Sequence, residues 1–158
     1  MKKLVVVRHG YYVDDSKGNL SPDGRQQVDR LGAVLAQQLN GHSVALLSST
    51  APRAKETSEI LAGHLGGVAF EEHWCLWSGG GDFRDGQEED VLCLVEERGQ
   101  THDVVVLSTH LEFIDYFPTV WGRKKGFEIK SGYDTPKGTA RVIDVATGQE
   151  EIVRPARS

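Results

Sequence analysis

The strongest constraint on the fold comes from two aliphatic runs that both lead into a histidine. Residues 4–7 (LVVV) are followed directly by Arg8 and His9, and residues 104–107 (VVVL) are followed by a serine, a threonine and His110. Runs of this kind, rich in β-branched residues, are typical of strands that are buried on both faces of a parallel sheet. Because ligands bind beyond the carboxyl ends of such strands, the sequence predicts one site that contains both histidines.

Strand and helix patterns alternate along most of the chain, and the last two strand patterns read as a hairpin. The alternation predicts an α/β fold, a three-layer sandwich whose mainly parallel central sheet carries helices on both faces and a C-terminal edge hairpin. A length of 158 residues suits a single domain over residues 1–158. The expected helices cover residues 21–39, 51–65, about 87–98 and 111–121, and the further expected strands cover residues 44–47, 68–72, 138–145 and 150–153.

Three local features refine the expected helix ends. Ser21 is a good N-cap residue for the first helix, with Pro22 at its first helical position. Thr50 or Ser49 is the expected cap of the second helix. Pro118 is expected to bend the last helix or to end it early, because proline lacks the backbone N–H that a helix interior needs.

Composition excludes several classes of partner. The net charge of −5 argues against a nucleic-acid groove and against an anionic membrane surface. Cys75 and Cys93 have no metal-binding spacing, so we expect both to be small buried hydrophobic residues in a reducing, cytoplasmic setting. The basic run at residues 123–125 is expected to be a solvated face. No stretch resembles a signal peptide or a membrane span, and the oligomeric state is left open.

Arg53 adds a cation to the expected site. It lies in the first turn of a helix that starts at the carboxyl end of a strand, where free N–H groups and the helix dipole favour an anion. A guanidinium there supplies a two-pronged donor for a phosphoryl group. A lone arginine on a helix surface is commonly just solvated, and the coincidence with the two strand-end histidines is what favours the anion site.

Four motifs in order resemble those of the histidine phosphatase superfamily, the phosphoglycerate-mutase-like fold: RHG at residues 8–10, LSPDG at 20–24, SSTAPRAKET at 48–57 and STH at 108–110. The short chain looks most like the SixA-type phosphohistidine phosphatases of that superfamily. The resemblance implies that His9 is the phosphorylated nucleophile, that Arg8 and Arg53 clamp the phosphoryl oxygens, and that His110 completes the phosphate-binding pocket. It implies no cofactor and no metal, and two histidines without a further ligand would make a poor zinc site.

The chain departs from the resemblance at the general acid. Relatives that act on alkyl esters carry a carboxylate in the segment after the helix of the third motif, whereas residues 74–79 read WCLWSG. Asp82 and Asp85 are the nearest candidates downstream, and Asp14 and Asp15 are weaker ones. An alkoxide leaving group needs a proton from an acid, but the nitrogen of phosphohistidine is readily protonated near neutral pH, so the missing acid favours a P–N substrate.

Three functional hypotheses follow. The first is a phosphatase that acts through phosphorylated His9 on phosphohistidine or another activated phosphoryl group of a protein. The second is a phosphatase of a small phosphomonoester, with Asp82 or Asp85 as the general acid. The third is a non-catalytic module that binds phosphorylated partners in the same pocket, although a pure binder would not need the nucleophile.

The segment between the third motif and the third helix is the least regular part of the chain. Its glycines at residues 79–81 lack the lysine of a P-loop and are interpreted as a flexible loop that could act as a lid. The aromatic residues Trp74, Trp77, Tyr11 and Tyr12 either line the substrate rim or fill the core, and burial in the core is the expectation for such large side chains.

Overall fold

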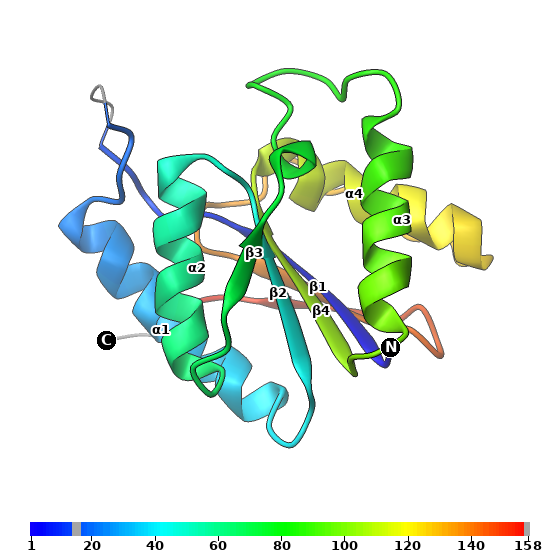
Figure 1. Cartoon of the computed structure of the whole chain (residues 1–158), viewed down its shortest axis with the longest axis horizontal. Helices are drawn as coiled ribbons and strands as arrows, with labels where there is room; N and C mark the ends of the chain where they lie inside the picture. The colour runs from blue at the N-terminus through cyan, green and yellow to red at the C-terminus, as the bar shows by residue number, and fades with distance from the viewer. Residues whose placement is uncertain (14–16, 157–158) are drawn as a thin grey trace.

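A six-stranded sheet forms the middle layer of the molecule (Figure 1). The computed structural model describes residues 1–13 and 17–156. The strand order is β3-β2-β4-β1-β5-β6, parallel from β3 to β1 and antiparallel at β5 and β6. Along the chain the elements are β1 (Lys3–Arg8), α1 (Pro22–Gln38), β2 (Val44–Ser48), α2 (Pro52–His64), β3 (Phe70–Glu72), the 3₁₀ turn η1 (Trp74–Leu76), α3 (Gln87–Gly99), β4 (Val104–Thr109), α4 (Leu111–Lys125), β5 (Ala140–Asp144) and β6 (Glu150–Val153).

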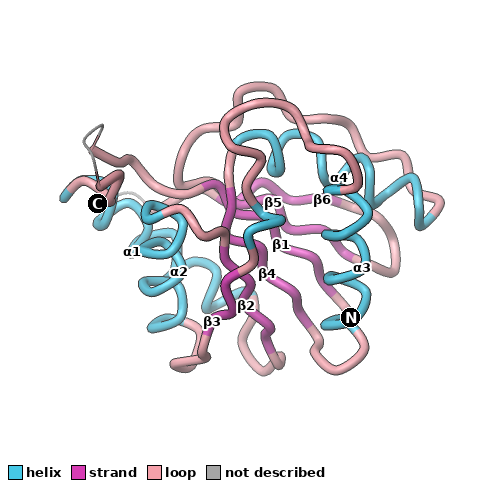
Figure 2. The backbone as a smooth tube through the Cα atoms, turned by 45° about the horizontal axis from the view of Figure 1, so that its top comes forward, coloured by secondary structure: helices cyan, strands magenta, loops and turns pink. Residues whose placement is uncertain are grey.

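Helices cover both faces of this sheet (Figure 2). The strands alternate their side chains between two apolar cores, as the period of two in a strand requires. Val5 and Val7 pack with α1 and α2 on one face, whereas Leu4 and Val6 pack with α3 and α4 on the other. The predicted α/β sandwich, its mainly parallel sheet and its edge hairpin are therefore confirmed.

The predicted cap of α1 is also confirmed, but the predicted cap of α2 is wrong. The Ser21 hydroxyl accepts the N–H of Gly24, and Pro22 begins the helix. Helix α2 has Ala51 at its N-cap, with no side-chain bond that caps it. Ser49 accepts the Ala51 N–H instead and turns toward a histidine that is described below.

Pro118 lies inside α4 and does not end it, because the helix continues to Lys125. Proline at this position cannot donate to the carbonyl of Ile114, four residues earlier. The buried side chain of Arg141, from β5, donates to that carbonyl over 2.6 Å and so satisfies it. A partner from a distant strand therefore allows the helix to pass through the proline.

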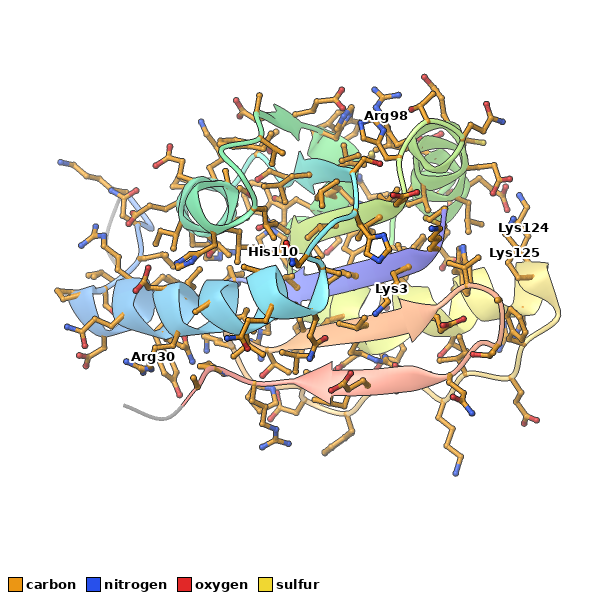
Figure 3. The ribbon with its side chains drawn as sticks, turned by 90° about the horizontal axis from the view of Figure 1, so that it is seen from below. Lys3, Arg30, Arg98, His110, Lys124 and Lys125 are labelled. Carbon is orange, nitrogen blue, oxygen red and sulfur yellow. The ribbon has the colours of Figure 1, made fainter. Side chains whose placement is uncertain are left out.

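Two surface features complete the fold. The basic run at the end of α4 is exposed as expected, and Figure 3 shows Lys124 and Lys125 at this end of the helix. The expectation for the cysteines is wrong, because Cys93 lies on the outer side of α3 and is exposed, and Cys75 is only half-buried. Within the described residues, no helix is long and apolar enough to cross a membrane.

Candidate active site

His9 directly follows β1, and its ring is held in one orientation. Its side chain is only 3% exposed, and Nδ1 lies 2.9 Å from the carbonyl oxygen of Gly10. Because a carbonyl can only accept, this contact assigns the ring hydrogen to Nδ1 and leaves a lone pair on Nε2. The Nε–H of Arg53 donates to that Nε2 over 3.2 Å. The nitrogen that could attack a phosphorus atom therefore already faces a cation.

Helix α2 is fixed against the end of β1 through Thr57. The Thr57 hydroxyl donates to the carbonyl of Arg53 over 2.8 Å and accepts the N–H of Gly10 over 3.2 Å. Gly10 itself lies so close to α1 that an added Cβ would come within 2.7 Å of a methyl carbon of Val28. Only glycine fits at position 10, because the backbone there lies so close to α1. The bond from Gly10 to Thr57 holds α2 where Arg53 can reach His9.

Arg8 is oriented by the loop that precedes β5. Its Nη1 donates to the carbonyl of Thr135 over 2.6 Å. The buried carboxylate of Asp115 in turn accepts from the hydroxyl and N–H of Thr135 and from the N–H of Asp134. The buried Nε of Arg8 has no hydrogen-bond partner in the part of the chain that the structure describes, so this guanidinium retains a donor for a ligand.

His110 occupies the turn between β4 and α4 and is 4% exposed (Figure 3). Its Nε2 lies 2.7 Å from the hydroxyl oxygen of Ser49. Since that oxygen already accepts the N–H of Ala51, its own hydrogen is available to donate to Nε2, which favours the tautomer with hydrogen on Nδ1. The ring lies 5.2 Å from that of His9, and Trp77 stacks on it at 5.7 Å.

Burial and positive charge keep both histidines neutral. Burial, with smaller contributions from Arg53, Arg8 and Lys137, lowers the pKa of His9 to about 3, although the Gly10 carbonyl opposes this shift. Burial, with the charges of the same two arginines and of His9, lowers the pKa of His110 to about 2. At neutral pH the site therefore offers an unprotonated imidazole among cations, which suits attack on an anionic phosphoryl group.

The four residues predicted from strand ends and the helix start line one cavity of about 320 Å³: Arg8, His9, Arg53 and His110. Arg8 and His9 lie at the end of β1, His110 follows β4, and Arg53 lies in the first turn of α2, which follows β2. All four meet at the carboxyl edge of the sheet, as expected for this fold class. Among the described residues, no group of three or more His, Cys, Asp or Glu side chains is placed to hold a metal ion. The cavity can hold a tetrahedral oxyanion between guanidinium and imidazole groups.

The candidate acids differ in their distance from this cavity. Asp82 belongs to its lining, whereas Asp85 does not. Asp14 and Asp15 lie outside the described residues. Sequence reasoning missed Glu112, which lines the cavity from the first turn of α4. Its place two residues after His110 was a signal that could have found it, because a strand end and the following helix turn face the same site.

Glu112 is held in place by hydrogen bonds from Ser78. One oxygen of Glu112 accepts the hydroxyl of Ser78 over 2.7 Å and its N–H over 3.3 Å.

Lys137 is a second residue near the site that the sequence did not reveal. Its Nζ lies 5.9 Å from the ring centre of Tyr11 and 5.8 Å from that of Tyr12. Burial and the charge of a neighbouring arginine lower the pKa of Lys137. Lys137 comes from a loop with no recognisable motif, so no sequence pattern indicated it.

The expectation that the four aromatic residues fill the core is wrong. Tyr11 is 51%, Tyr12 36% and Trp74 66% exposed. Tyr12 and Trp77 line the cavity, and the guanidinium carbon of Arg53 lies 4.7 Å from the Tyr12 ring centre. Gly80 and Gly81 of the predicted flexible loop line the cavity too. Tyr12 and Trp77 thus belong to the rim of the site, whereas Tyr11 and Trp74 are exposed outside the cavity lining.

Comparisons with known proteins agree with this geometry. The model of the histidine phosphatase superfamily (branch 1) matches residues 4–77. The solved structure of the protein histidine phosphatase SixA complexed with tungstate has a TM-score of 0.75 at 16% identity, over 97% of each chain. A phosphohistidine phosphatase SixA from Nakamurella multipartitia, described as putative, has a TM-score of 0.67 at 21% identity, over 99% of this chain and 97% of its own.

A third similar structure has a different substrate in its name. It is the mycobacterial glucosyl-3-phosphoglycerate phosphatase, with a TM-score of 0.70 at 17% identity over 100% of both chains. Among curated proteins, none matches this chain by sequence. The TM-scores show that these proteins share the fold of this chain. The family match covers three of the four motifs. The chain is thus similar to the histidine phosphatase superfamily over residues 4–77, just under half of its 158 residues, and it shares the fold of these solved phosphatases.

Proposed function

We propose that the protein is a phosphatase that works through a phosphohistidine intermediate on His9, without a metal. The observation that carries the proposal is the contact between Arg53 Nε and His9 Nε2, at 3.2 Å, in the same cavity as Arg8 and His110. This contact leaves the attacking nitrogen unprotonated and next to a donor for phosphoryl oxygens. A binding site alone would not require a nucleophile there.

The reaction proceeds in two displacements. In the first, the lone pair of His9 Nε2 forms a bond to phosphorus as the bond to the leaving group breaks, and the leaving group takes up a proton. In the second, a water molecule attacks phosphorus, the bond to Nε2 breaks, and inorganic phosphate leaves. Arg8, Arg53 and His110 stabilise the charge on the equatorial oxygens in both steps.

We propose phosphohistidine on a protein as the substrate class. The leaving imidazole is protonated near neutral pH and needs no dedicated acid. The surface around the cavity also suits a macromolecule, because most of the large hydrophobic side chains that are exposed lie in segments at this edge of the sheet: Tyr11, Tyr12, Val13, Trp74, Tyr116 and Tyr133. Two of the similar structures are described as protein histidine or phosphohistidine phosphatases, which supports the same class.

A small phosphomonoester is the alternative substrate. It is favoured by the carboxylates of Asp82 and Glu112, since either lines the cavity from which an alkoxide would have to be protonated. Asp85 is the weaker candidate, because it is outside this lining. The likeness to a glucosyl-3-phosphoglycerate phosphatase supports the same alternative. A binding module without turnover is the third possibility, and His9 argues against it.

The deciding experiment compares phosphate release from a phosphohistidine-bearing protein and from a panel of alkyl phosphomonoesters, with EDTA present. The wild type is expected to favour phosphohistidine, and His9→Ala to lose at least about 10³-fold in activity, as removal of a nucleophile does. His102→Ala is the matched control, because this histidine contacts Thr101 and the carbonyl of Arg98 at the end of α3 and is not part of the cavity lining. A base-stable, acid-labile phosphoryl group on the wild-type protein, absent from His9→Ala, would identify the intermediate.

Other outcomes separate the alternatives. Faster release from an alkyl ester that is lost in Asp82→Asn or Glu112→Gln would establish the phosphomonoester phosphatase and name its acid. Retention of full activity by His9→Ala would overturn both enzymatic hypotheses. Absence of release from every substrate, with retained binding of phosphohistidine protein, would support the binding module.

A further inference from the structure

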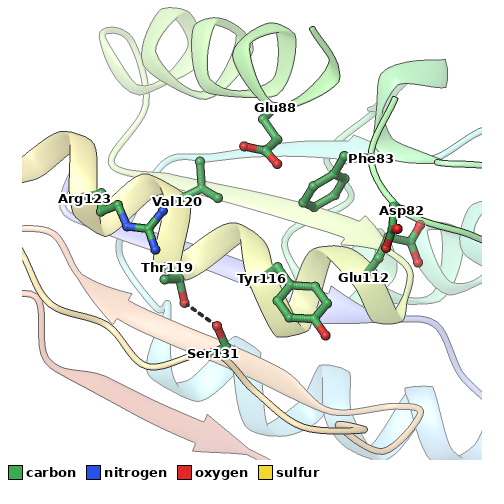
Figure 4. Close-up of a pocket in the computed structure, with 9 residues that line it drawn as sticks. All are labelled: Asp82, Phe83, Glu88, Glu112, Tyr116, Thr119, Val120, Arg123 and Ser131. Atoms are coloured by element: carbon green, nitrogen blue, oxygen red, sulfur yellow. Dashed lines mark hydrogen bonds between the residues drawn. The ribbon is translucent and has the colours of Figure 1, made fainter. Parts of the chain in front are cut away.

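The cavity that contains Arg8, His9, Arg53 and His110 is called the phosphate cavity from here on. A second cavity, of about 410 Å³, runs along the exposed side of α4 beside it (Figure 4). The two cavities share three lining residues: Asp82, Glu112 and Tyr116. The second one continues past them between the start of α3 and the loop that contains Ser131. We call it the flanking groove, because a ligand that places its phosphoryl group near His9 can extend directly into it.

The walls of the flanking groove combine negative charge with apolar surface. Asp82, Glu88 and Glu112 contribute three carboxylates, and Arg123 contributes one cation. Phe83, Val120 and the 52% exposed Tyr116 supply the apolar part. Figure 4 shows Arg123 at the end of the groove away from Asp82 and Glu112, so the part nearest the phosphate cavity is acidic.

These walls are fixed by the interior of the protein. Phe83 packs edge-on against Phe113 of α4, with 4.8 Å between ring centres. Glu112 is held by the two bonds from Ser78, on the opposite segment. The other side is closed by the hydrogen bond between Thr119 and Ser131, 3.2 Å long. The groove is therefore a formed surface, and a substrate segment would not have to order it on binding.

The two cavities differ in their unshared charges: Arg8 and Arg53 line only the phosphate cavity, Glu88 lines only the groove, and Asp82 and Glu112 form the wall between them. A ligand complementary to both carries a phosphoryl group and, next to it, a positive charge. An acidic neighbour would be repelled by the same carboxylates.

We propose that the flanking groove binds the protein segment beside the phosphorylated residue and selects a lysine or arginine followed by an apolar side chain. The proposal rests on the function proposed above and specifies the substrates of that same site. The cation of the segment would lie near Glu88 and Glu112, and its apolar side chain would pack on Phe83, Tyr116 and Val120. The exposed tyrosine suits such contact, since it offers a large surface at a small loss of side-chain entropy.

The test uses three phosphohistidine peptides of equal length that differ only in the two residues on either side of the phosphohistidine: lysines, serines or glutamates. A small phosphoramidate serves as the substrate that cannot reach the groove. Glu88→Gln removes one carboxylate that lines the groove and not the phosphate cavity. Glu89→Gln is the matched control, because it removes the same charge from the same helix turn but outside the groove.

We expect the wild type to prefer the lysine peptide over the glutamate peptide in kcat/KM, and the preference to shrink at high salt. Glu88→Gln should raise KM for the lysine peptide by about 2- to 5-fold with kcat unchanged, as loss of one partly exposed ion pair does. It should leave phosphoramidate hydrolysis unchanged, and Glu89→Gln should change neither. Glu88→Lys should reverse the preference between the lysine and glutamate peptides.

Equal rates for the three peptides, or equal effects of Glu88→Gln and Glu89→Gln, would overturn the proposal. A concentration-dependent dimer that Glu88→Lys disrupts would assign the groove to a second copy of the chain and would also overturn it. Failure of the proposed function is a separate result, because the small phosphoramidate would then not be hydrolysed. In that event, binding of the three peptides to the His9→Ala protein still tests the groove.

Discussion

His9 and His110 lie in the same cavity, but different groups hold their rings. A backbone carbonyl holds Nδ1 of His9, whereas the Ser49 hydroxyl holds Nε2 of His110. The first contact leaves a lone pair for attack, and the second leaves a ring N–H for a phosphoryl oxygen. Two identical side chains thereby become suited to different tasks, through one hydrogen bond each.

The depressed pKa values predict how both activity and stability respond to acid. The ring of His9, with a pKa of about 3, should show no titration between pH 8 and 5 when its Cε1 proton is followed by NMR. A midpoint near the ordinary value of about 6.5 would contradict this. His9 thus remains competent as a nucleophile well below neutral pH.

Linkage gives the corresponding prediction for stability. The unfolded chain takes up a proton on each histidine near pH 6.5, whereas the folded protein takes them up only at about 3 and about 2. Unfolded protein therefore binds more protons between these values, and the free energy of unfolding falls as pH drops below 6.5, by up to about 1.4 kcal/mol per pH unit for each histidine. Urea unfolding at several pH values should show that the free energy of unfolding depends less steeply on pH in His110→Gln than in the wild type.

Ser49 is expected to position His110. Ser49→Ala removes the 2.7 Å contact and frees the ring, so kcat should fall by about 10-fold, whereas KM for a small substrate should change little. Ser48→Ala is the comparison, because its buried hydroxyl bonds to the carbonyl of Ser49 and does not touch His110. Both variants should lose similar stability, about 1 kcal/mol. Equal loss of kcat in the two would show that Ser49 acts only through the fold.

Among single residues, the sequence predicted those that end strands and begin helices. Arg8, His9 and His110 follow apolar runs, and Arg53 opens a helix, so local pattern was sufficient to group them. Lys137 could not be found in this way, because its position depends on an antiparallel strand returning to the same edge. The exposure of Tyr12 was missed for a related reason: aromatic residues favour the core on average, and only the tertiary fold identifies those that line a site.

Close packing between α1 and the segment after β1 predicts that alanine substitutions of glycines in two helices change stability in opposite directions. A Cβ on Gly24 would lie 2.0 Å from the carbonyl oxygen of Tyr11, which must then move. Gly24→Ala should lower the free energy of unfolding by about 1–3 kcal/mol and reduce activity, since Tyr12, the residue after Tyr11, lines the cavity. Gly63→Ala, in α2, meets no atom within 4 Å and should raise stability by about 0.5–1 kcal/mol with activity unchanged. Urea unfolding of both variants checks the opposite signs.

The helices also show where local signals are sufficient and where they are not. The Ser21 cap and the following proline act within four residues, and the sequence predicted them. The end of α4 was mispredicted because the group that compensates for Pro118 is Arg141, on a strand 23 residues further along the chain. A proline in a helix pattern therefore signals a boundary only when no distant donor satisfies the freed carbonyl.

Over the whole molecule, Arg141 connects the edge hairpin to the candidate site. Besides the Ile114 carbonyl, it donates to the carbonyl of Lys130 over 2.8 Å and pairs with Glu150 of β6. The loop that leads on from Lys130 contains the Thr135 carbonyl that holds Arg8. The last two strands of the chain thus contribute to the orientation of a residue in the first.

This connection is testable by a double-mutant cycle. Arg141→Met should lower the free energy of unfolding by at least about 1–3 kcal/mol, because buried carbonyls lose their donor. Pro118→Ala restores a backbone N–H that can bond to Ile114, so the same arginine change should cost less in that background, by about 0.5–3 kcal/mol. Equal cost in both backgrounds, measured by urea unfolding, would mean that Arg141 and Pro118 are independent.

The α/β sandwich itself was predictable because strand order in such folds follows from a few rules on parallel strands and their connections. The aliphatic runs and the hairpin pattern identified five strands of the sheet, and the sixth, β3, was expected only as a short strand over residues 68–72. The flanking groove was not predictable, because its walls come from α3, α4 and two loops that are distant in sequence. The wall that it shares with the phosphate cavity, formed by Asp82, Glu112 and Tyr116, likewise has no sequence motif.

That shared wall bears on the design of inhibitors. An oxyanion of the size of tungstate would fill only the phosphate cavity, and a guanidinium compound only the acidic part of the groove. A single molecule with a phosphonate at one end and a guanidinium at the other would occupy both cavities across Asp82, Glu112 and Tyr116. Because a short linker holds the second group at an effective concentration of about 1 mM or more, such a compound would bind more tightly than either half without making any new contact.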